Sequence, residues 1–195
     1  MQEHSNVAFK EWAVVVEALG EGEQILILRK GGISEQRGQF EVQHREFWLY
    51  PTQFHEAERA IIPSMRPALR QSAARTSDDF VDIQFYAAAD PVIKITDPTR
   101  LHRLQGRHIW SETVLQERFE FGREKGLHAL LVRVYQLPAP ERISMRENYG
   151  GCKSWIELER AISTAHLTPV LTDAAFNAQR DEICELLSDH ALTHP

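Results

Sequence analysis

The sequence predicts an α+β fold, with a curved or barrel-like, mixed but mainly antiparallel sheet flanked by several short helices. Strand-like and helix-like segments are mixed along the 195 residues, without the βαβα alternation of a doubly wound parallel sheet. The sequence contains no internal repeat, low-complexity tract or long Pro/Gly/Ser linker. We therefore expect a single domain over residues 1–195, with its core at about 7–160 and an acidic helical segment at about 171–189.

The chain is expected to begin with a helix that is followed by a strand. Apolar residues recur at three- and four-residue spacing over residues 7–19, and Gly20 stands where a helix C-cap is expected. Isoleucine and leucine then dominate residues 24–29, which is typical of a buried strand.

A second strand is predicted at residues 46–50, where Pro51 stops it. Thr52 can then cap a helix over residues 53–61, because its hydroxyl can accept a hydrogen bond from the first turn. Residues 64–79 mix proline, serine and arginine with little periodicity. They predict a surface connection with one short helix.

The second half of the chain is expected to combine strands with short capped helices. Strands are predicted at residues 82–88, 91–96, 127–137 and 153–158. Helices are predicted at residues 97–104, 112–121 and 173–187. Asp97 and Ser111 are the expected N-caps of the first two helices. Pro138 and Pro140 are expected to end the strand that begins at residue 127.

Composition indicates an ordinary globular protein of the cytoplasm. Hydrophobic residues make up 43% of the chain and charged residues 26%, which argues against disorder. The two cysteines, Cys152 and Cys184, are too few for a disulfide framework or a zinc site. The apolar runs are far too short to cross a membrane. We expect no membrane association, no metal and no other cofactor.

Charge is distributed unevenly, although the net charge is −6. Residues 171–195 contain five acids and one base, whereas residues 100–108 contain three arginines, two histidines and no acid. The overall acidity argues against coating by nucleic acid, but a local basic segment leaves a focused phosphate site open. Solvated surface is the alternative interpretation of that segment.

The common signatures of nucleotide and hydrolase sites are missing from the sequence. It contains no GxxxxGK[ST] phosphate loop, no GxGxxG after a strand, no HExxH zinc motif and no GxSxG nucleophile elbow. These absences lower the expectation of a metal-dependent or nucleophilic hydrolase.

Two glycine pairs beside cations are candidate phosphate-binding loops. The first is Arg29-Lys30-Gly31-Gly32, and the second is Gly150-Gly151 with Lys153. Glycines let backbone N–H groups approach an anion closely, and the cations supply charge. A hairpin corner explains the first pair equally well.

Two histidines are candidate acid–base groups. His55 follows Tyr50 and Thr52 in the first turn of a predicted helix, whose dipole attracts anions and favours neutral imidazole. His108 lies between Arg107 and Trp110, a combination that suits a phosphate or a nucleobase. A surface histidine in the first case and a buried tryptophan between solvated bases in the second are the alternatives.

Arg133 and Tyr135 lie on one face of the strand predicted at residues 127–137. That face would present both side chains either to a pocket or to solvent. We include them with Tyr50, Thr52, Arg107 and Trp110 among the candidate phosphate- or nucleic-acid-binding residues.

Five short motifs together resemble the family catalogued as domain of unknown function 1802, over roughly residues 9–187. They are Lys10-Glu11-Trp12, Leu28-Arg29-Lys30-Gly31-Gly32-Ile33, Leu49-Tyr50-Pro51-Thr52-x-x-His55, Arg133-Val134-Tyr135 and Gly150-Gly151-Cys152-x-Ser154-Trp155. The resemblance implies a bacterial or archaeal protein. Because some family members are joined to a restriction-endonuclease-like domain, it also implies a link to restriction or DNA metabolism, with a restriction-type nuclease as partner.

Three functions are compatible with these residues. The first is an accessory module that binds nucleic acid or nucleotide in a basic cleft. The second is a metal-independent enzyme acting on a phosphorylated substrate, with His55 or His108 as acid–base. The third is a protein-interaction or structural subunit that docks through its acidic C-terminal helix. The first requires that loops far apart in the sequence converge in space.

Overall fold

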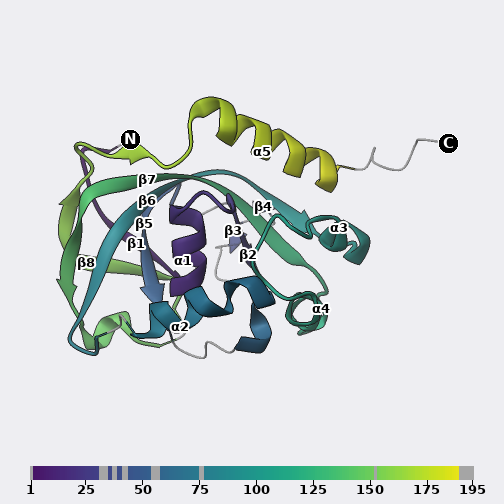
Figure 1. Ribbon diagram of the computed structural model, residues 1–195, viewed down its shortest axis with the longest axis horizontal. Coiled ribbons are helices and arrows are strands. Elements are labelled where there is room, and N and C mark those ends of the chain that lie inside the picture. Colours follow the sequence, from purple (N-terminus) through teal and green to yellow (C-terminus); the bar gives the residue numbers. More distant parts are fainter. Residues whose placement is uncertain are drawn as a thin grey trace.

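A seven-stranded mixed sheet forms the centre of the computed structural model (Figure 1). Its strands are β1 (His4–Trp12), β2 (Leu26–Arg29), β5 (Glu46–Thr52), β6 (Phe80–Ile95), β7 (Leu127–Ser144), β8 (Trp155–Ser163) and β9 (Thr168–Pro169). They lie in the order β2-β7-β6-β5-β1-β8, and β9 pairs with β7. Among these described strands, β1 and β5 are the one pair that runs parallel. The predicted α+β class with a curved, mainly antiparallel sheet is confirmed.

The structure describes residues 2–30, 35–36, 39–40, 44–53, 58–74, 77–151 and 153–188. A separate two-stranded hairpin pairs β3 (Glu35–Gln36) with β4 (Gln39–Phe40). The α-helices are α1 (Ala13–Gly20), α2 (Arg66–Ala74), α3 (Pro98–Arg103), α4 (Glu112–Glu120) and α5 (Asp173–Leu187). Among the helices of these described ranges, none has both the length and the apolar composition needed to cross a membrane.

The N-terminal helix is shorter than the spacing of apolar residues predicts. Residues 4–12 form strand β1, and helix α1 begins only at Ala13. Strand β1 lies between β5 and β8, and the successive side chains of Ala8 and Phe9 are both fully buried on opposite faces. A strand that is buried on both faces lacks the alternation of apolar and polar residues by which strands are identified in a sequence. The apolar residues of β1 and of the following helix therefore look like one helical pattern.

Gly20 is the last residue of α1 rather than its C-cap. A Cβ atom at this position would lie 2.2 Å from Cζ of Phe85. A larger residue at this position would therefore displace the ring of Phe85, which approaches the end of the helix closely.

Strand β7 continues to Ser144, so the prediction that Pro138 and Pro140 end it is wrong. Both prolines are exposed. They lie where the pairing with β6 is irregular, because the register jumps from Gln136 opposite Phe85 to Glu141 opposite Ile83. An irregularity of this kind accommodates proline, which has no backbone N–H to donate to the hydrogen bonds between the strands. The two strands predicted at residues 82–88 and 91–96 are likewise one strand, β6, with a register shift.

The other predicted elements fall close to their expected places. Asp97 caps α3, Ser111 caps α4 and Thr172 caps α5 through side-chain oxygens that accept backbone N–H groups. Helix α2 is the short helix expected within residues 64–79. Of the helix predicted at 53–61, residues 58–60 form a single 3-10 turn, and residues 54–57 lie outside the described residues.

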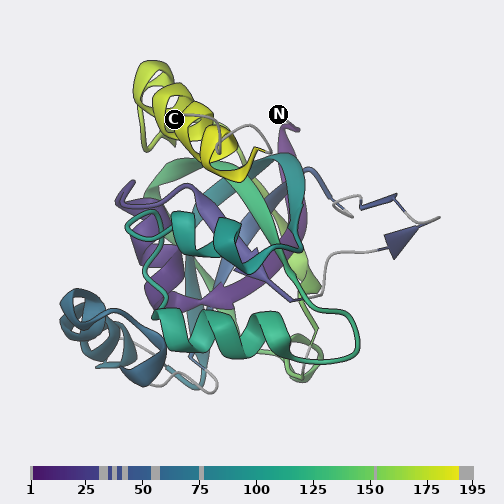
Figure 2. The same ribbon diagram turned by 90° about the vertical axis from the view of Figure 1, so that its right-hand side faces the viewer.

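Two hydrophobic clusters lie on the two faces of the sheet. Phe9, Phe47 and Leu49 belong to the larger cluster, which also buries α1. Figure 1 shows α1 enclosed by the curved sheet, and Figure 2 shows α3 and α4 side by side across one end of it. The smaller cluster contains Trp48 and Tyr50. Strand β5 thus supplies alternate residues to both cores, as the pleat of a strand requires.

Candidate functional site

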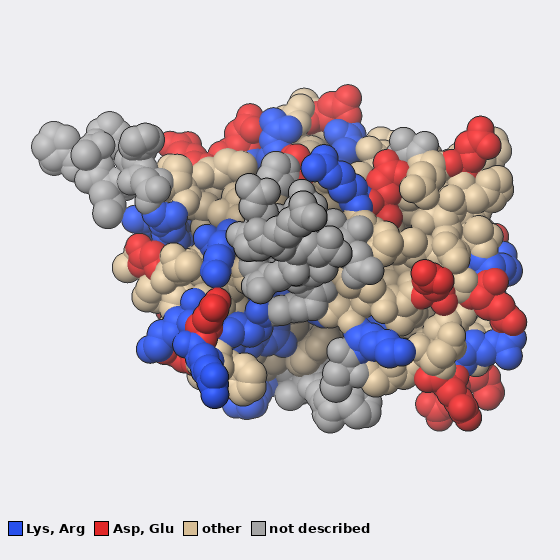
Figure 3. Space-filling view, turned by 180° about the vertical axis from the view of Figure 1, so that it is seen from behind, with Lys and Arg blue, Asp and Glu red and all other residues tan. Residues whose placement is uncertain are grey.

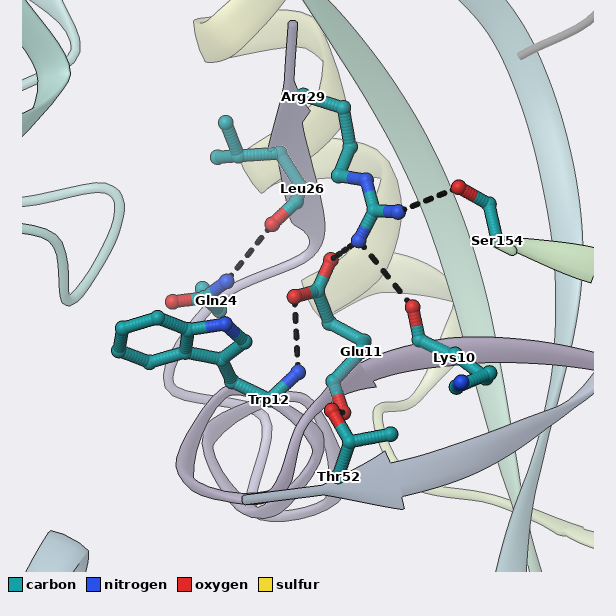
Figure 4. A network of polar contacts seen from close by, with 8 residues as sticks. All are labelled: Lys10, Glu11, Trp12, Gln24, Leu26, Arg29, Thr52 and Ser154. Atoms are coloured by element: carbon teal, nitrogen blue, oxygen red, sulfur yellow. Dashed lines mark hydrogen bonds and ion pairs between the residues drawn. The ribbon is translucent and has the colours of Figure 1, made fainter. Parts of the chain in front are cut away.

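Four sequence motifs meet at the C-terminal end of β1, at residues 10–12. Arg29 at the end of β2 contacts Glu11, and Thr52 at the end of β5 donates a 3.1 Å hydrogen bond from Oγ1 to the Glu11 carbonyl. Ser154, just before β8, accepts a 2.7 Å hydrogen bond from Arg29 Nη2. The ring of Trp110 packs edge-on against Trp12, with centroids 4.8 Å apart. Figure 4 shows Arg29 pointing toward both Glu11 and Ser154.

A buried carboxylate lies at the centre of this arrangement. Glu11 is 2% exposed, and its Oε2 lies 3.1 Å from Nη1 of Arg29. Its other oxygen accepts a 2.8 Å hydrogen bond from the backbone N–H of Trp12. Arg29 also donates to the Lys10 carbonyl at 3.1 Å, and its guanidinium lies 4.8 Å from the ring centroid of Phe9. The predicted phosphate ligand Arg29 is therefore engaged in an internal ion pair that joins three strands.

Lys10 holds the second glycine-pair loop against β1. Its ammonium donates to the carbonyls of Tyr149 and Gly151, at 2.7 and 2.9 Å. Gly151 has φ of +75°, a conformation that favours glycine. The neighbouring Lys153 is exposed, and within the described residues it forms no hydrogen bond or ion pair. The side chain of Lys153 in this loop therefore faces solvent.

Lys30, the second predicted phosphate ligand, stabilises the loop that follows α4. Its ammonium donates to the carbonyls of Phe119, Glu124 and Gly126, at 3.1, 2.5 and 3.0 Å. These three acceptors use the three donors of an ammonium group. Lys30 thereby fixes the segment of residues 121–126.

Arg118 on α4 lies against the tryptophan pair. Its guanidinium lies 3.9 Å from the ring centroid of Trp110 and 5.5 Å from that of Trp12. Burial lowers the pKa of Arg118, while the charge of Glu11 opposes that shift. The guanidinium has no hydrogen-bond partner among the described residues. Its N–H donors therefore remain available on a half-buried, stacked cation.

The loop after α4 exposes an aromatic ring among cations. Phe121 is 73% exposed, although large aromatic side chains are mostly buried. Arg123, two residues further, is exposed and forms no ion pair within the described ranges. Lys125 pairs with Glu120 at 2.5 Å, and Lys94 on β6 lies 3.5 Å from Glu124. We call Lys94, Arg118, Phe121, Arg123 and Lys125 the α4 surface.

Figure 3 shows Lys and Arg side chains gathered at the lower left of the face seen from behind, on the side that carries α4, with a few acidic side chains among them. Sequence reasoning missed Arg118, Phe121 and Arg123. The available signal was a phenylalanine directly before a short segment that is bounded by Gly122 and Gly126 and contains two bases.

Helix α5 forms ion pairs with two of the other predicted phosphate ligands and contacts two further arginines. Arg107 pairs with Glu182, and Arg133 pairs with Asp173. Arg100 and Arg103 donate to the carbonyls of Leu187 and Leu186 at the C-terminal end of the helix, at 3.2 and 3.4 Å. Cations at this end interact favourably with the helix dipole. The basic segment and the acidic tail therefore bind each other.

Arg133 and Tyr135 lie on the β7 face near α5, as the strand period predicts. The Arg133 guanidinium lies 5.6 Å from the Tyr135 ring and 5.3 Å from the Phe176 ring. Tyr50 is buried, its hydroxyl lies 2.9 Å from Met145 Sδ, and burial raises its pKa to about 12. Arg133, Tyr135 and Tyr50 therefore take part in contacts within the protein.

His108 is a buried histidine next to a small cavity of about 30 Å³. Both ring nitrogens are inaccessible, and neither has a hydrogen-bond partner in the described part of the chain. Burial lowers the pKa of His108 to about 4, although the nearby backbone of Trp110 opposes this shift. The ring is therefore neutral at physiological pH and packed away from solvent. Gly31, Gly32, His55 and Cys152 lie outside the described residues.

No group of three or more His, Cys, Asp or Glu side chains suited to a metal ion occurs in the ranges that the structure describes. The arrangement at β1 and α4 supplies cations, aromatic rings and one buried carboxylate. Cations bind anions and aromatic rings stack on flat rings, whereas the carboxylate of Glu11 is already paired with Arg29.

The chain is similar in structure to the ASCH protein of Zymomonas mobilis, with a TM-score of 0.47 and 15% identity over 79% of this chain and 87% of that one. Two single-residue variants of that protein give TM-scores of 0.45 and 0.44, with 14% and 15% identity over 82% and 79% of this chain and 92% and 90% of theirs. No curated protein sequence matches the chain. Residues 8–182 match the family model described as Domain of unknown function (DUF1802), and the chain belongs to that family.

Proposed function

We propose that the protein binds single-stranded nucleic acid at the α4 surface, as an accessory module. The observation that carries the proposal is the ring of Phe121, which is 73% exposed and lies three residues after Arg118 and two before Arg123. Proteins that bind single strands combine cations that contact phosphates with aromatic rings on which bases stack. An exposed phenylalanine in an otherwise polar loop fits that combination.

Two guanidinium groups of the α4 surface have no acidic partner among the described residues and can therefore bind phosphate. Lys125 and Lys94 each lie close to a glutamate, whereas Arg118 and Arg123 have no hydrogen-bond or ion-pair partner among the described residues. A guanidinium can donate two parallel hydrogen bonds to one phosphate. The stacking of Arg118 on Trp110 fixes the plane of its donors. The proposal therefore moves the phosphate site from the residues predicted from the sequence to α4 and the loop that follows it, and keeps only Lys153 of the predicted cations as a further solvent-facing group.

The preference for single strands follows from the aromatic ring. Bases in a duplex are stacked on one another, and a ring on the protein surface cannot stack on them without unpairing. A single strand offers its bases freely, and each base stacked on an aromatic ring contributes about 1–3 kcal/mol. A restriction-type nuclease as partner remains a prediction.

Fluorescence anisotropy with labelled 12-nucleotide DNA and RNA, single-stranded and duplex, at low and moderate salt tests the proposal. We expect single strands to bind more tightly, with an affinity that falls as salt rises because bound cations are released from phosphates. Phe121→Ala should weaken binding by about 1–3 kcal/mol. Arg160→Ala is the matched surface control, because Arg160 lies on β8, on the far side of the molecule from α4 in Figure 1.

Two results would count against the proposal. One is binding that does not change between the two salt concentrations. The other is an affinity that Phe121→Ala and Arg160→Ala reduce equally. If duplex and single strands bind alike but Arg123→Ala still weakens both, the phosphate contact stands and base stacking on Phe121 is excluded.

A further inference from the structure

A cavity of about 320 Å³ lies beside helices α1 and α2 and strands β5 and β6. Figure 1 shows α1 and α2 next to each other at this side of the sheet. The volume lies at the lower end of the range of about 300–1,000 Å³ in which proteins bind small molecules. The cavity shares no residue with the α4 surface, so it is a separate site.

Most of the residues that line the cavity are apolar, among them Leu49 and Phe85. Asp82 also lines it, but its carboxylate already accepts two hydrogen bonds from Arg142, at 2.8 and 3.0 Å. Glu17, the other acid of the lining, also interacts within the protein. The acids of the lining therefore indicate no preference for a charged ligand.

Gln84 is the lining residue whose polar atoms indicate a ligand. It is half-buried on β6, and its carboxamide has no hydrogen-bond partner in the described part of the chain. Gln53, which also lines the cavity, instead donates a 2.5 Å hydrogen bond to the Ser72 carbonyl. A carboxamide has an oxygen that accepts and an NH2 group that donates. Gln84 therefore offers an acceptor and a donor side by side to a molecule in the cavity.

Gln84 lies where the pairing of β6 with β7 is irregular. The register shifts between Ile83 and Phe85, and these two side chains pack into the clusters on opposite faces of the sheet. In a regular strand, residues two positions apart share a face. Irregularities of this kind are frequent next to functional sites, where they redirect a side chain. The irregularity therefore supports a binding role for Gln84.

Two aromatic rings of the lining are held by contacts within the protein. The Arg142 guanidinium lies 3.8 Å from the ring centroid of Phe80, and the same guanidinium binds Asp82. The Phe85 ring lies so close to Gly20 that a Cβ atom there would be 2.2 Å from its Cζ. A site whose walls are already fixed costs little ordering free energy when a ligand binds.

We propose that this cavity binds a small molecule that carries a primary amide or a lactam on a flat apolar body. The amide N–H of the ligand donates to Oε1 of Gln84, and its carbonyl accepts from Nε2, so that the two amides form a pair of hydrogen bonds. Phe80 and Phe85 contact the flat body, since aromatic rings pack in offset or edge-on arrangements. A ketone of the same shape accepts from Nε2 but leaves Oε1 without a donor.

An NMR titration of isotope-labelled protein with 2-naphthamide and methyl 2-naphthyl ketone tests the proposal. The two probes have nearly the same shape and differ by an NH2 group in place of a methyl group. We expect the amide to bind about three- to tenfold more tightly, which is the contribution of one hydrogen bond. The amide should also shift the side-chain NH2 signal of Gln84.

Gln84→Met keeps the length of the side chain but removes both hydrogen-bonding groups, so the two probes should bind it equally. Gln71→Met is the matched control, because Gln71 is exposed on α2 and does not line the cavity. It should keep the preference for the amide. Thermal unfolding establishes that both variants are folded.

The proposal is overturned if neither probe binds, if the unaltered chain binds both equally, or if a folded Gln84→Met variant still prefers the amide. The comparison of the two probes in the unaltered chain decides the proposal even where Gln84→Met does not fold. Titration of nucleic acid is a separate measurement, so failure here leaves the α4 surface unaffected.

Discussion

The guanidinium of Arg29 and the carboxylate of Glu11 form an ion pair in which the acid is 2% exposed. Arg29 is the last residue of β2, and Glu11 lies near the end of β1. These two strands are not neighbours in the sheet. Because Arg29 also bonds Ser154, the pair joins the end of β1 to the segment that enters β8 and to β2. A buried charge of this kind is costly when its partner is removed.

Arg29→Met should therefore destabilise the protein strongly. It leaves the Glu11 carboxylate buried without its partner, and the expected loss in unfolding free energy is about 3–5 kcal/mol. Urea denaturation measures it. Arg59→Met is the control, because Arg59 pairs with Glu117 at 3.3 Å on an exposed surface, where such pairs contribute about 0–1 kcal/mol. Equal losses in the two variants would contradict the role assigned to the buried pair.

Lys30→Met should loosen the loop after α4 without removing a phosphate contact. The ammonium bonds three carbonyls at residues 119, 124 and 126, so we expect faster amide hydrogen exchange over residues 121–126, measured by mass spectrometry. The salt dependence of nucleic-acid binding should keep its slope, whereas Arg123→Ala should reduce that slope by about one. A reduced slope in Lys30→Met would instead make Lys30 a phosphate ligand.

The sequence predicts well those helices and strands whose signals come from residues adjacent in the chain. Helices α3, α4 and α5 directly follow Asp97, Ser111 and Thr172, whose side chains cap them, and caps depend on neighbouring residues alone. The N-terminal strand was missed because its burial on both faces depends on partners far along the chain. The continuation of β7 through Pro138 was missed because it depends on an irregularity in the pairing with β6.

Motif reasoning found the segments that meet at β1, but it did not anticipate that two of their cations have partners within the protein. A basic residue next to glycines suits an anion from outside, yet Arg29 binds Glu11 and Lys30 binds three carbonyls. Glu11 belongs to one of the five motifs, but it was assigned no role, because a single acid does not by itself indicate a chemistry. A cavity of about 320 Å³ beside α1, α2, β5 and β6 has no local signal either, because its lining residues come from separate segments of the chain.

Stability should fall as the pH drops from about 6.5 toward 4. The pKa of His108 is about 4 in the folded protein because burial disfavours the charged ring, so the unfolded chain, with a pKa near 6.5, binds the proton first. The contribution of neutral His108 is complete above about pH 6.5 and is lost below it, by about 3 kcal/mol at most. His128, whose pKa is also lowered to about 4, acts in the same direction.

Thermal unfolding between pH 7 and pH 4 measures this effect. His108→Leu should flatten the decline, because the replacement cannot take up a proton in either state. His102→Gln, a change of an exposed histidine, should leave the decline as steep as before. A decline unchanged by His108→Leu would show that other groups control acid stability.

Helix α5, which lies in the acidic C-terminal part of the chain, should be required for folding. Phe176, Ile183 and Leu187 are at most 5% exposed and belong to the larger hydrophobic cluster. Burial of three such side chains contributes about 5–9 kcal/mol, which is comparable to the whole stability of a domain. Removal of residues 171–195 should therefore unfold the chain rather than leave a folded core without a docking surface.

Single substitutions in α5 test the same prediction through smaller losses of unfolding free energy. Ile183→Ala should lower the unfolding free energy by about 2–5 kcal/mol, because the neighbouring core cannot fully close the space left behind. Cys184→Ala, at the adjacent exposed position, should change it by no more than about 0.5 kcal/mol. Urea denaturation distinguishes the two. A truncated chain that unfolds cooperatively at nearly the original denaturant concentration would show that α5 is a separable attachment, and docking through its acidic face would then become testable on its own.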